Sequence, residues 1–550
     1  MAYRPSICLP TRREILRDMG VAGGLAAGGL VVPGVFATPA AAAASNTLIV
    51  AVSATPVSRD PEYGASLESW ELPVFIYEYL LCYYFKKGAD GVGMPQFEPP
   101  YEPRLAETVD VSADGKKLTF HLRKGVKSEY GNLFTADDVK WSWDRTFSLK
   151  TAGMWMMKSS SIPSAEAIKV IDPYTLEVDL SGPNSLLMTE QATSLNNPVI
   201  YDSTEAKKHA TTSDPWAKDW LGKNSATFGP YKVTQFTPGQ VVVFEVNPYY
   251  YRAKPKIPRV IWREVPSSAT RLELLLAGAV HIAKELEPLQ RQQCEGKPGV
   301  KVTAIKGNEA VMFALNNDVK PFDNVKVRQA IAYAAPIDAI IDTVYLKQPN
   351  VRLFKGYTPE SYPAAIDYWP YYPTNLDKAK GLLKEAGQGP FSFKLAQNAA
   401  RPEHEQVAVQ IQTQLKKLDI DVQIQKLTPA AYQEEYFSRK AEAVLVQDCA
   451  WVADPAYSLG LFFGSGPTSV ANWINYSNKK VDALLDECFN TADATKRREL
   501  GKQAHRIIVD EAPWAFSIGI GFYMTARSEV SGLNWRANNL LDYAEMSLGA

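Results

Sequence analysis

The sequence predicts an α/β protein built from two or three lobes. Three observations indicate this: strand-like and amphipathic helical segments alternate, about 505 residues follow an N-terminal export signal, and no low-complexity linker divides them. A single hydrophobic core normally splits into several at this length. Because no flexible linker separates the lobes, we expect strands that cross from one lobe to another and return.

The first half of the chain shows clear strand patterns and one strong helix start. Gly115 in "SADGK" predicts a tight turn between two strands, because glycine supplies backbone freedom that other residues lack. Thr135, with Asp138 three residues later, is an acidic variant of the capping box and predicts a helix that follows. The strand patterns lie at 116–126, 175–181 and 241–246.

The second half repeats a helix followed by a strand. Residues 375–387 predict a helix with Asn375 as its N-cap and Gly387 as its C-terminal stop. A second helix is expected to run to about Leu418 and to lead directly into a strand at 420–424. This alternation is typical of a sheet covered by helices.

The N-terminus has the features of a cleaved export signal. Arg12 and Arg13 precede residues 19–44, which carry no charge and are long enough for a bilayer, which needs about 20 residues. Six glycines and two prolines interrupt this run, and it ends in an alanine tract, so cleavage before Ser45 is favoured over a retained membrane helix. Residues 11–17 resemble a twin-arginine export motif. No cysteine ends the run, so no lipid anchor is expected.

Charge and cysteine content narrow the possible partners. Residues 1–44 hold four basic and two acidic side chains, so their removal moves the formal net charge from −1 to −3. This balance gives no basic stripe and argues against nucleic-acid binding. A chain of this size has no need of disulfides, and a twin-arginine cargo folds in a reducing compartment. We therefore expect four buried free thiols, at Cys82, Cys294, Cys449 and Cys488.

Catalytic and metal-binding signatures are missing from the sequence. It contains no GxSxG, HExxH, CxxC or Walker motif. Adjacent carboxylates such as Asp137 and Asp138 point to different sides of a helix, which is typical of solvated faces. The five histidines are far apart in the sequence, at 121, 209, 281, 404 and 505. We therefore expect a protein that is not an enzyme and has no cofactor and no metal site.

Three long blocks, at 105–147, 228–283 and 316–345, carry a family resemblance. The second contains a "GPY" turn, an "NPYY" corner and a helix of the form R-x-x-x-L-x-x-G. These blocks resemble the dipeptide, oligopeptide and nickel class (family 5) of periplasmic solute-binding proteins that feed ABC importers. Departures occur at His281, at 336–338 and at Lys347, where the family usually has other residues. They put the subfamily and ligand in doubt and leave the fold intact.

The resemblance implies a two-lobed clamshell of the periplasmic-binding-protein type, class II-like and of the large cluster C type, with an extra α+β domain inserted in the first lobe. A solute that contacts both lobes stabilises the closed state, because it binds that state more tightly than the open one. The implied boundaries are a signal peptide at 1–44, lobe I at 45–80, 222–308 and 513–550, an inserted domain at 81–221, and lobe II at 309–512.

The resemblance also implies the ligand site. Asp454 in "WVADP" is the expected contact for a ligand ammonium group, Trp451 is the expected stacking wall, and Asp448 is the weaker alternative to Asp454. An Asp-Pro turn that merely ends a strand is the structural alternative for Asp454. Arg401 is expected to hold a ligand carboxylate, a task that suits a planar guanidinium, unless it is only a solvated residue at a helix start. Tyr457 and Trp473 are further candidates for the lining, although aromatic residues near strand ends often belong to the core.

The implied function is an extracytoplasmic solute-binding protein that captures a small solute, most simply a short peptide, and delivers it to permease subunits of an ABC importer in the inner membrane. A monomer in the periplasm is expected, exported by the twin-arginine route. Within the family, an oligosaccharide, an opine-like compound or a metal chelate are alternative ligands, since one scaffold hosts several functions. From other classes, an exported hydrolase and a chaperone-like peptide binder without an importer are the alternatives.

Overall fold

The structure is a computed structural model, which describes most of the chain after residue 45. The predicted signal peptide, its cleavage site and the twin-arginine motif lie outside the described residues. No helix among the described residues is long and apolar enough to span a bilayer. The described ranges are 46–63, 67–183, 186–193, 199–449, 451–466, 469, 471–537 and 539–549.

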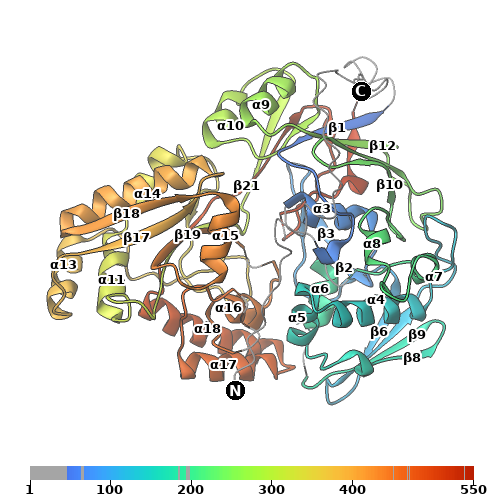
Figure 1. Cartoon of the computed structure of the whole chain (residues 1–550), viewed down its shortest axis with the longest axis horizontal. Helices are drawn as coiled ribbons and strands as arrows, with labels where there is room; N and C mark the ends of the chain where they lie inside the picture. Colours follow the sequence, from blue (N-terminus) through green and yellow to red (C-terminus); the bar gives the residue numbers. More distant parts are fainter. Residues whose placement is uncertain are drawn as a thin grey trace. The chain divides into compact units, whose positions relative to one another are not determined.

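A seven-stranded mixed sheet is assembled from three distant stretches of the chain. Figure 1 shows this as blue β1 beside green β12, with red β21 in the same sheet. β1 pairs in parallel with β12 and β13, and β21 is inserted between β13 and β14 in antiparallel orientation. The order is β10 (Tyr231–Thr237), β11 (Val241–Val246), β12 (Arg259–Glu264), β1 (Thr47–Val52), β13 (Ile282–Ala283), β21 (Phe522–Arg527) and β14 (Val300–Ile305).

A second, six-stranded sheet carries the helices of the second half of the chain. β17 lies parallel to both β18 and β19, whereas β15 pairs antiparallel with β19 and β20. The order is β16 (Arg352–Leu353), β20 (Trp514–Gly519), β15 (Ala310–Leu315), β19 (Ala443–Asp448), β17 (Phe391–Asn398) and β18 (Ile420–Leu427). The main helices here are α11 (Val325–Ala334), α13 (Leu376–Glu385), α14 (Pro402–Leu415), α15 (Pro429–Phe437), α16 (Pro455–Phe463), α17 (Lys479–Phe489) and α18 (Ala494–Glu511).

A four-stranded antiparallel sheet has a core of its own. Leu118 and Phe120 of β7 are buried, and Trp143 from α4 packs edge-on against Phe120 with ring centroids 6.4 Å apart. Its order is β6 (Ala106–Val111), β7 (Lys117–Leu122), β9 (Thr175–Asp179) and β8 (Ile168–Asp172). The helices near this sheet in the sequence are α4 (Ala136–Leu149), α5 (Ala152–Ser159) and α6 (Leu186–Thr193).

Short elements complete the described chain. The two-stranded pairs are β2 (Leu81–Cys82) with β5 (Glu102–Pro103), β3 (Phe85–Lys87) with β4 (Gly93–Pro95), and β22 (Val530–Ser531) with β23 (Ser547–Leu548). The remaining helical segments are η1 (Pro61–Tyr63), α3 (Leu67–Ile76), η2 (Ala165–Ala167), α7 (Ser203–Lys208), α8 (Lys218–Leu221), α9 (Ser268–Leu276), α10 (Pro288–Cys294), α12 (Ile337–Ala339), η3 (Ile340–Val344), η4 (Lys416–Leu418) and η5 (Tyr543–Glu545).

The local predictions are confirmed where sequence signals were strong. Gly115 has a φ of +69°, and its N–H donates to the Ser112 carbonyl at 2.8 Å, so it forms the predicted turn between β6 and β7. The Thr135 N–H donates to the Asp138 carboxylate at 2.8 Å at the start of α4. The Asn375 side chain caps α13 by accepting from the Lys378 N–H at 2.9 Å. The α/β class follows from these elements and from the two large sheets.

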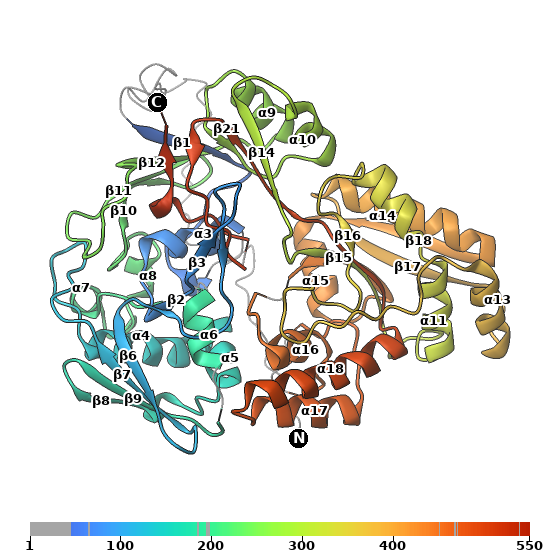
Figure 2. The same ribbon diagram turned by 180° about the vertical axis from the view of Figure 1, so that it is seen from behind.

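The chain crosses between the two large sheets twice, and the two crossings lie side by side. The first joins β14 to β15, and the second joins β20 to β21 (Figure 2). The Ile520 N–H donates to the Glu309 carbonyl at 3.0 Å. A Cβ atom on Gly307 would lie 2.9 Å from the Phe522 nitrogen, so only glycine allows this approach. The predicted lobe boundary lies before residue 513, ahead of β20. Because β20 pairs in the six-stranded sheet, the second crossing lies further along the chain, near Ile520.

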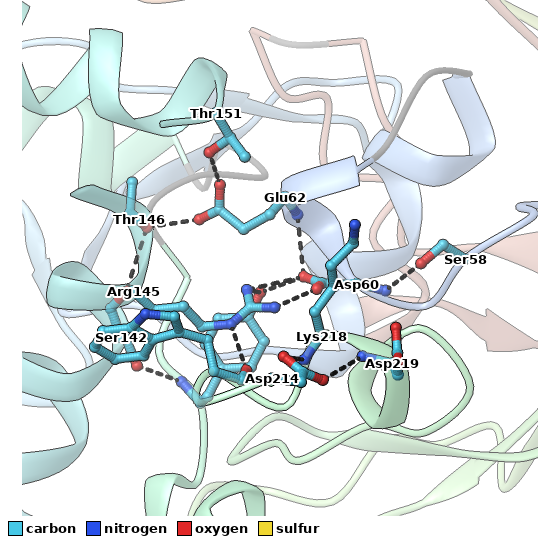
Figure 3. A network of polar contacts seen from close by, with 12 residues as sticks. Ser58, Asp60, Glu62, Ser142, Arg145, Thr146, Thr151, Asp214, Lys218 and Asp219 are labelled. Carbon is cyan, nitrogen blue, oxygen red and sulfur yellow. Dashed lines mark hydrogen bonds and ion pairs between the residues drawn. The ribbon is translucent and has the colours of Figure 1, made fainter. Parts of the chain in front are cut away.

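A buried charge network fixes the chain between β1 and α3. Asp60 and Arg145 form a fully buried ion pair, and the Tyr201 hydroxyl donates to Asp60 at 2.8 Å (Figure 3). Glu62 accepts hydrogen bonds from the hydroxyls of Thr146 and Thr151. Burial raises the pKa of the Glu62 carboxyl. This network ties the segment around η1 to α4 and to Thr151, the N-cap of α5.

The four cysteines among the described residues are all free and buried. This confirms the prediction of unpaired thiols at Cys82, Cys294, Cys449 and Cys488.

Candidate functional site

Arg401 lies where β17 gives way to α14. It occupies the N-cap position of α14, and Pro402 fills the first helical position. Its guanidinium is 38% exposed and makes one long ion pair, with Nη1 3.8 Å from Glu403 Oε1. Burial acts to lower the pKa of this group, but the charges of Glu309 and Glu403 raise it above its usual value. The guanidinium stays cationic and keeps donors available for an anionic group.

Asp448 ends the neighbouring strand, β19. Since β17 and β19 are parallel and adjacent, their carboxyl ends meet at one edge of the sheet, and Arg401 and Asp448 follow at that edge. Asp448 Oδ1 accepts from the Cys449 N–H at 2.7 Å. Burial raises the pKa of the Asp448 carboxyl to about 7, with Glu309 acting in the same direction and Arg401 against it. The edge therefore holds one permanent cation beside a titratable acid.

Glu309 contributes a second carboxylate from the start of β15. Its Oε1 accepts from Gln447 Nε2 at 2.8 Å, and the side chain is only partly buried. Its charge acts on both Arg401 and Asp448. Sequence reasoning missed Glu309, because nothing in the local pattern distinguishes it from a solvated residue before a strand.

Several aromatic side chains lie near Asp448. The charge of Asp448 contributes, after burial, to the raised pKa values of Tyr436 and Tyr457. Trp473 packs 4.3 Å from Tyr436 between ring centroids, and Tyr457 packs 5.8 Å from Trp155. The Tyr457 hydroxyl and Trp473 Nε1 are buried without a partner among the described residues. Tyr457 and Trp473 are thus core residues whose polar ends remain unpaired.

Trp451 contacts an aromatic residue from the part of the chain that carries the seven-stranded sheet. Its ring lies 5.5 Å from that of Trp70, which belongs to α3. Both side chains are partly exposed. Met156 of α5 and Leu186 of α6 also pack into the hydrophobic core of the six-stranded sheet. Groups from the first half of the chain therefore adjoin the edge at which Arg401 and Asp448 lie.

Asp454 is placed differently from the expected ammonium contact. Its Oδ1 accepts from the N–H groups of Ala456 and Tyr457, at 2.9 and 3.1 Å, and so caps α16. Its Oδ2 pairs with Arg497, and the whole residue is only 6% exposed. Both oxygens are engaged within the protein, at the start of a helix rather than at the end of a strand. Sequence held the signal: an aspartate directly before a proline is a common helix start.

The segment after β13 and helix α3 supply acidic groups that sequence reasoning also missed. Glu285 follows β13 in the left-handed region, at φ +51°, and its charge acts on Arg401. Glu68 on α3 is buried, which raises the pKa of its carboxyl to about 7. Lys284 pairs with Glu71 of α3, with Nζ 3.1 Å from Oε2.

The arrangement places opposite charges close together. Acids and one available arginine lie together at the edge of the six-stranded sheet, as an ampholyte would require. Among the described residues, no group of histidine, cysteine and acidic side chains is placed to hold a metal ion.

Comparison with known proteins identifies the family. Residues 100–469 match the family described as bacterial extracellular solute-binding proteins, family 5. The chain belongs to this family. Its members bind solutes without catalysis, so the hydrolase alternative is not supported. Family membership confirms the resemblance drawn from the three sequence blocks.

Relatives that are named for different ligands align with nearly the whole chain. Heme-binding protein A of Haemophilus influenzae is 27% identical over 88% of this chain and 89% of its own length. The dipeptide-binding protein of Escherichia coli is 26% identical over 90% of this chain and 93% of its own. The DppA periplasmic binding protein of Helicobacter pylori, solved with the peptide STSA, superposes with a TM-score of 0.79 at 26% identity, covering 92% of this chain and 98% of that one. These matches confirm the periplasmic-binding-protein fold.

Proposed function

We propose that this protein captures a short peptide in the periplasm by its two charged ends and delivers it to an ABC importer. The single observation that carries the proposal is the placement of Asp448 and Arg401 at one edge of the six-stranded sheet, after two adjacent parallel strands. A peptide is an ampholyte at neutral pH, and this edge offers an acid and a base to match it. Ligands of α/β sheets commonly bind beyond the carboxyl ends of parallel strands.

Each end of the peptide has a suitable partner. The ammonium group approaches Asp448, with Glu309 as a second carboxylate nearby. The carboxylate approaches Arg401, whose planar guanidinium favours two parallel hydrogen bonds. Asp448 replaces Asp454 in the first role, because Asp454 is occupied by the α16 backbone and Arg497.

Contacts from the two halves of the molecule, each built on one large sheet, support capture by closure. Trp70 and Trp451 meet at 5.5 Å, and Glu285 acts electrostatically on Arg401. A ligand that touches groups from both halves favours the closed arrangement by its differential affinity. Moving a population from mostly open to mostly closed requires about 5.5 kcal/mol of such preference. Asp448 and Arg401 follow strands of the same sheet, so their contacts hold the ligand in both states. The preference for closure must come from groups on the side of the seven-stranded sheet, such as Trp70 and Glu285.

The relatives are named for different ligands, which include heme, dipeptides and glutathione. Family membership alone therefore does not choose among these ligands. A peptide is favoured here because Asp448 and Arg401 provide opposite charges at one edge. Export by the twin-arginine route and interaction with inner-membrane permease subunits belong to the same proposal. They rest on the motif at 11–17 and on the periplasmic binding proteins among the relatives.

Native mass spectrometry of the protein purified from its own periplasm tests the proposal. A co-purifying peptide in the two- to five-residue range is the expected result. A bound tetrapyrrole, sugar or metal chelate would contradict the peptide assignment while leaving the family intact. For the export route, replacing Arg12 and Arg13 by lysine should leave the protein in the cytoplasmic fraction, and unchanged periplasmic yield would contradict it.

A further inference from the structure

Three buried polar side chains behind Arg401 have unpaired atoms. Tyr345, Gln397 and His404 are 2%, 0% and 1% exposed. Within the described part of the chain, the Tyr345 hydroxyl, both amide atoms of Gln397 and His404 Nδ1 have no hydrogen-bond partner. Nearly all buried polar atoms in proteins are paired, so each exception calls for an explanation. We call these three residues the amide cluster.

Gln397 and His404 meet on one face of the six-stranded sheet. Leu395 of β17 pairs in parallel with Ala443 of β19, so alternate residues onward, including Gln397 and Gln447, share a face. The Gln447 side chain lies 3.3 Å from His404 Nε2, so this is the face that α14 covers. Tyr345 follows η3, which is held to α14 by the hydrogen bond from Gln410 Nε2 to Thr343 Oγ1 at 3.3 Å.

The amide cluster adjoins Arg401, whose carbonyl accepts a hydrogen bond from the His404 N–H at 3.0 Å. Burial raises the pKa of Tyr345, and the charges of Glu403 and Arg401 also act on it. Burial and the Arg401 charge lower the pKa of His404 to about 3. Both side chains are therefore neutral at physiological pH, and both lie within electrostatic range of the guanidinium proposed to hold the ligand carboxylate.

We infer that the amide cluster is a subsite for a neutral, hydrogen-bonding side chain, a carboxamide above all, on the ligand residue whose carboxylate Arg401 holds. The inference rests on the proposed function and adds a side-chain preference to it. Gln397 offers a donor and an acceptor side by side, which another amide matches with two hydrogen bonds. An apolar side chain would leave the polar atoms of the cluster unpaired. A charged side chain would lose its hydration in a buried site, at a greater cost than an amide.

Unpaired polar groups make a site selective for ligands that can form hydrogen bonds with them. A site built to hydrogen-bond a substrate group rejects an analogue that lacks it far more strongly than an apolar pocket rejects an isostere. Burial keeps water away from Gln397 and His404, so their partners must come from a bound group or from enclosed water. Enclosed water alone would leave the site indifferent to the ligand side chain, which separates the two explanations.

Calorimetric titration with two dipeptides tests the subsite. Alanyl-glutamine and alanyl-methionine have side chains of similar length, and only the first carries an amide. The wild-type protein should bind alanyl-glutamine at least tenfold more tightly. Gln397→Met should reduce this ratio to below about threefold. Gln423→Met, on the exposed part of β18, is the matched control and should leave the ratio unchanged.

Tyr345→Phe removes one hydroxyl and should lower the ratio by a smaller factor, which keeps the test valid if Gln397→Met fails to fold. Equal affinity for the two dipeptides in the wild type, or an unchanged ratio in both variants, would overturn the subsite while leaving peptide capture intact. If neither dipeptide binds the wild type while other solutes do, the proposed function itself fails, and the subsite assignment fails with it.

Discussion

Replacing Asp448 by asparagine separates its proposed role in binding from its effect on stability. Asparagine keeps the shape and removes the charge that the ligand ammonium needs. A charge-assisted hydrogen bond contributes about 1.5 to 3 kcal/mol, which corresponds to a loss of about 10- to 150-fold in affinity. Calorimetric titration with alanyl-alanine at pH 7.5 measures this loss. Asp421→Asn, on exposed β18, is the matched control and should bind as the wild type does.

The same substitution should stabilise the ligand-free protein at neutral pH. The Asp448 pKa rises from 3.8 to about 7 in the folded state, so the folded protein binds this proton more tightly than the unfolded chain. Stability contributed by such a group falls as pH rises from about 4 to about 7, and the full penalty applies above pH 7. A shift of about three pKa units corresponds to about 4 kcal/mol, and partial exposure reduces this to roughly 2 kcal/mol. The variant should therefore melt at a higher temperature than the wild type at pH 8, with a smaller difference at pH 5.

The pH dependence of binding provides a second signature. Ammonium binding requires the carboxylate, so wild-type affinity for alanyl-alanine should fall by up to about tenfold per pH unit below pH 7. Asp448→Asn should show no such slope. Wild-type affinity in Asp448→Asn, or a binding curve independent of pH in the wild type, would refute the assignment of Asp448 as the ammonium contact.

Three further substitutions probe neighbouring features. Asp454→Asn should lower the free energy of unfolding by about 3 to 5 kcal/mol in urea, because it leaves buried Arg497 unpaired. Its affinity for alanyl-alanine, measured by calorimetry, should stay within about threefold of the wild type. Unchanged stability with lost affinity would return Asp454 to the binding site. Arg401→Ala should weaken alanyl-alanine binding about tenfold or more and leave an amidated dipeptide unaffected, and equal effects on both would remove the carboxylate contact. Asp60→Asn should destabilise by about 3 to 5 kcal/mol through Arg145, measured by urea unfolding, and a change below 1 kcal/mol would contradict the buried network.

The fold could be predicted largely from local signals. Gly115, Thr135 and Asn375 fix a turn and two helix starts through short-range backbone chemistry, and the structure places each as expected. The crossings could not be placed to the residue from sequence, because β20 and β21 are separated only by Ile520 and Gly521 and belong to different sheets.

The candidate site was harder to predict because its charges come from distant segments. Asp454 and Asp448 are six residues apart, and only the position of Arg497 shows which carboxylate is already paired. The Asp-Pro sequence at 454–455 suggested a turn that ends a strand, whereas Asp454 caps α16 in the structure. Glu309, Glu285 and Trp70 lie in three separate parts of the chain, and no local pattern links them to Arg401.

The insertion of β21 between β13 and β14 has a consequence for biosynthesis. During translation, a ribosome that has made the first 500 residues has still not supplied the strand that joins the two flanks of the seven-stranded sheet. Both flanks keep open edges until β21 emerges from the ribosome. Completion of this sheet therefore comes late in synthesis, and loss of β21 would damage the part of the protein that is made first.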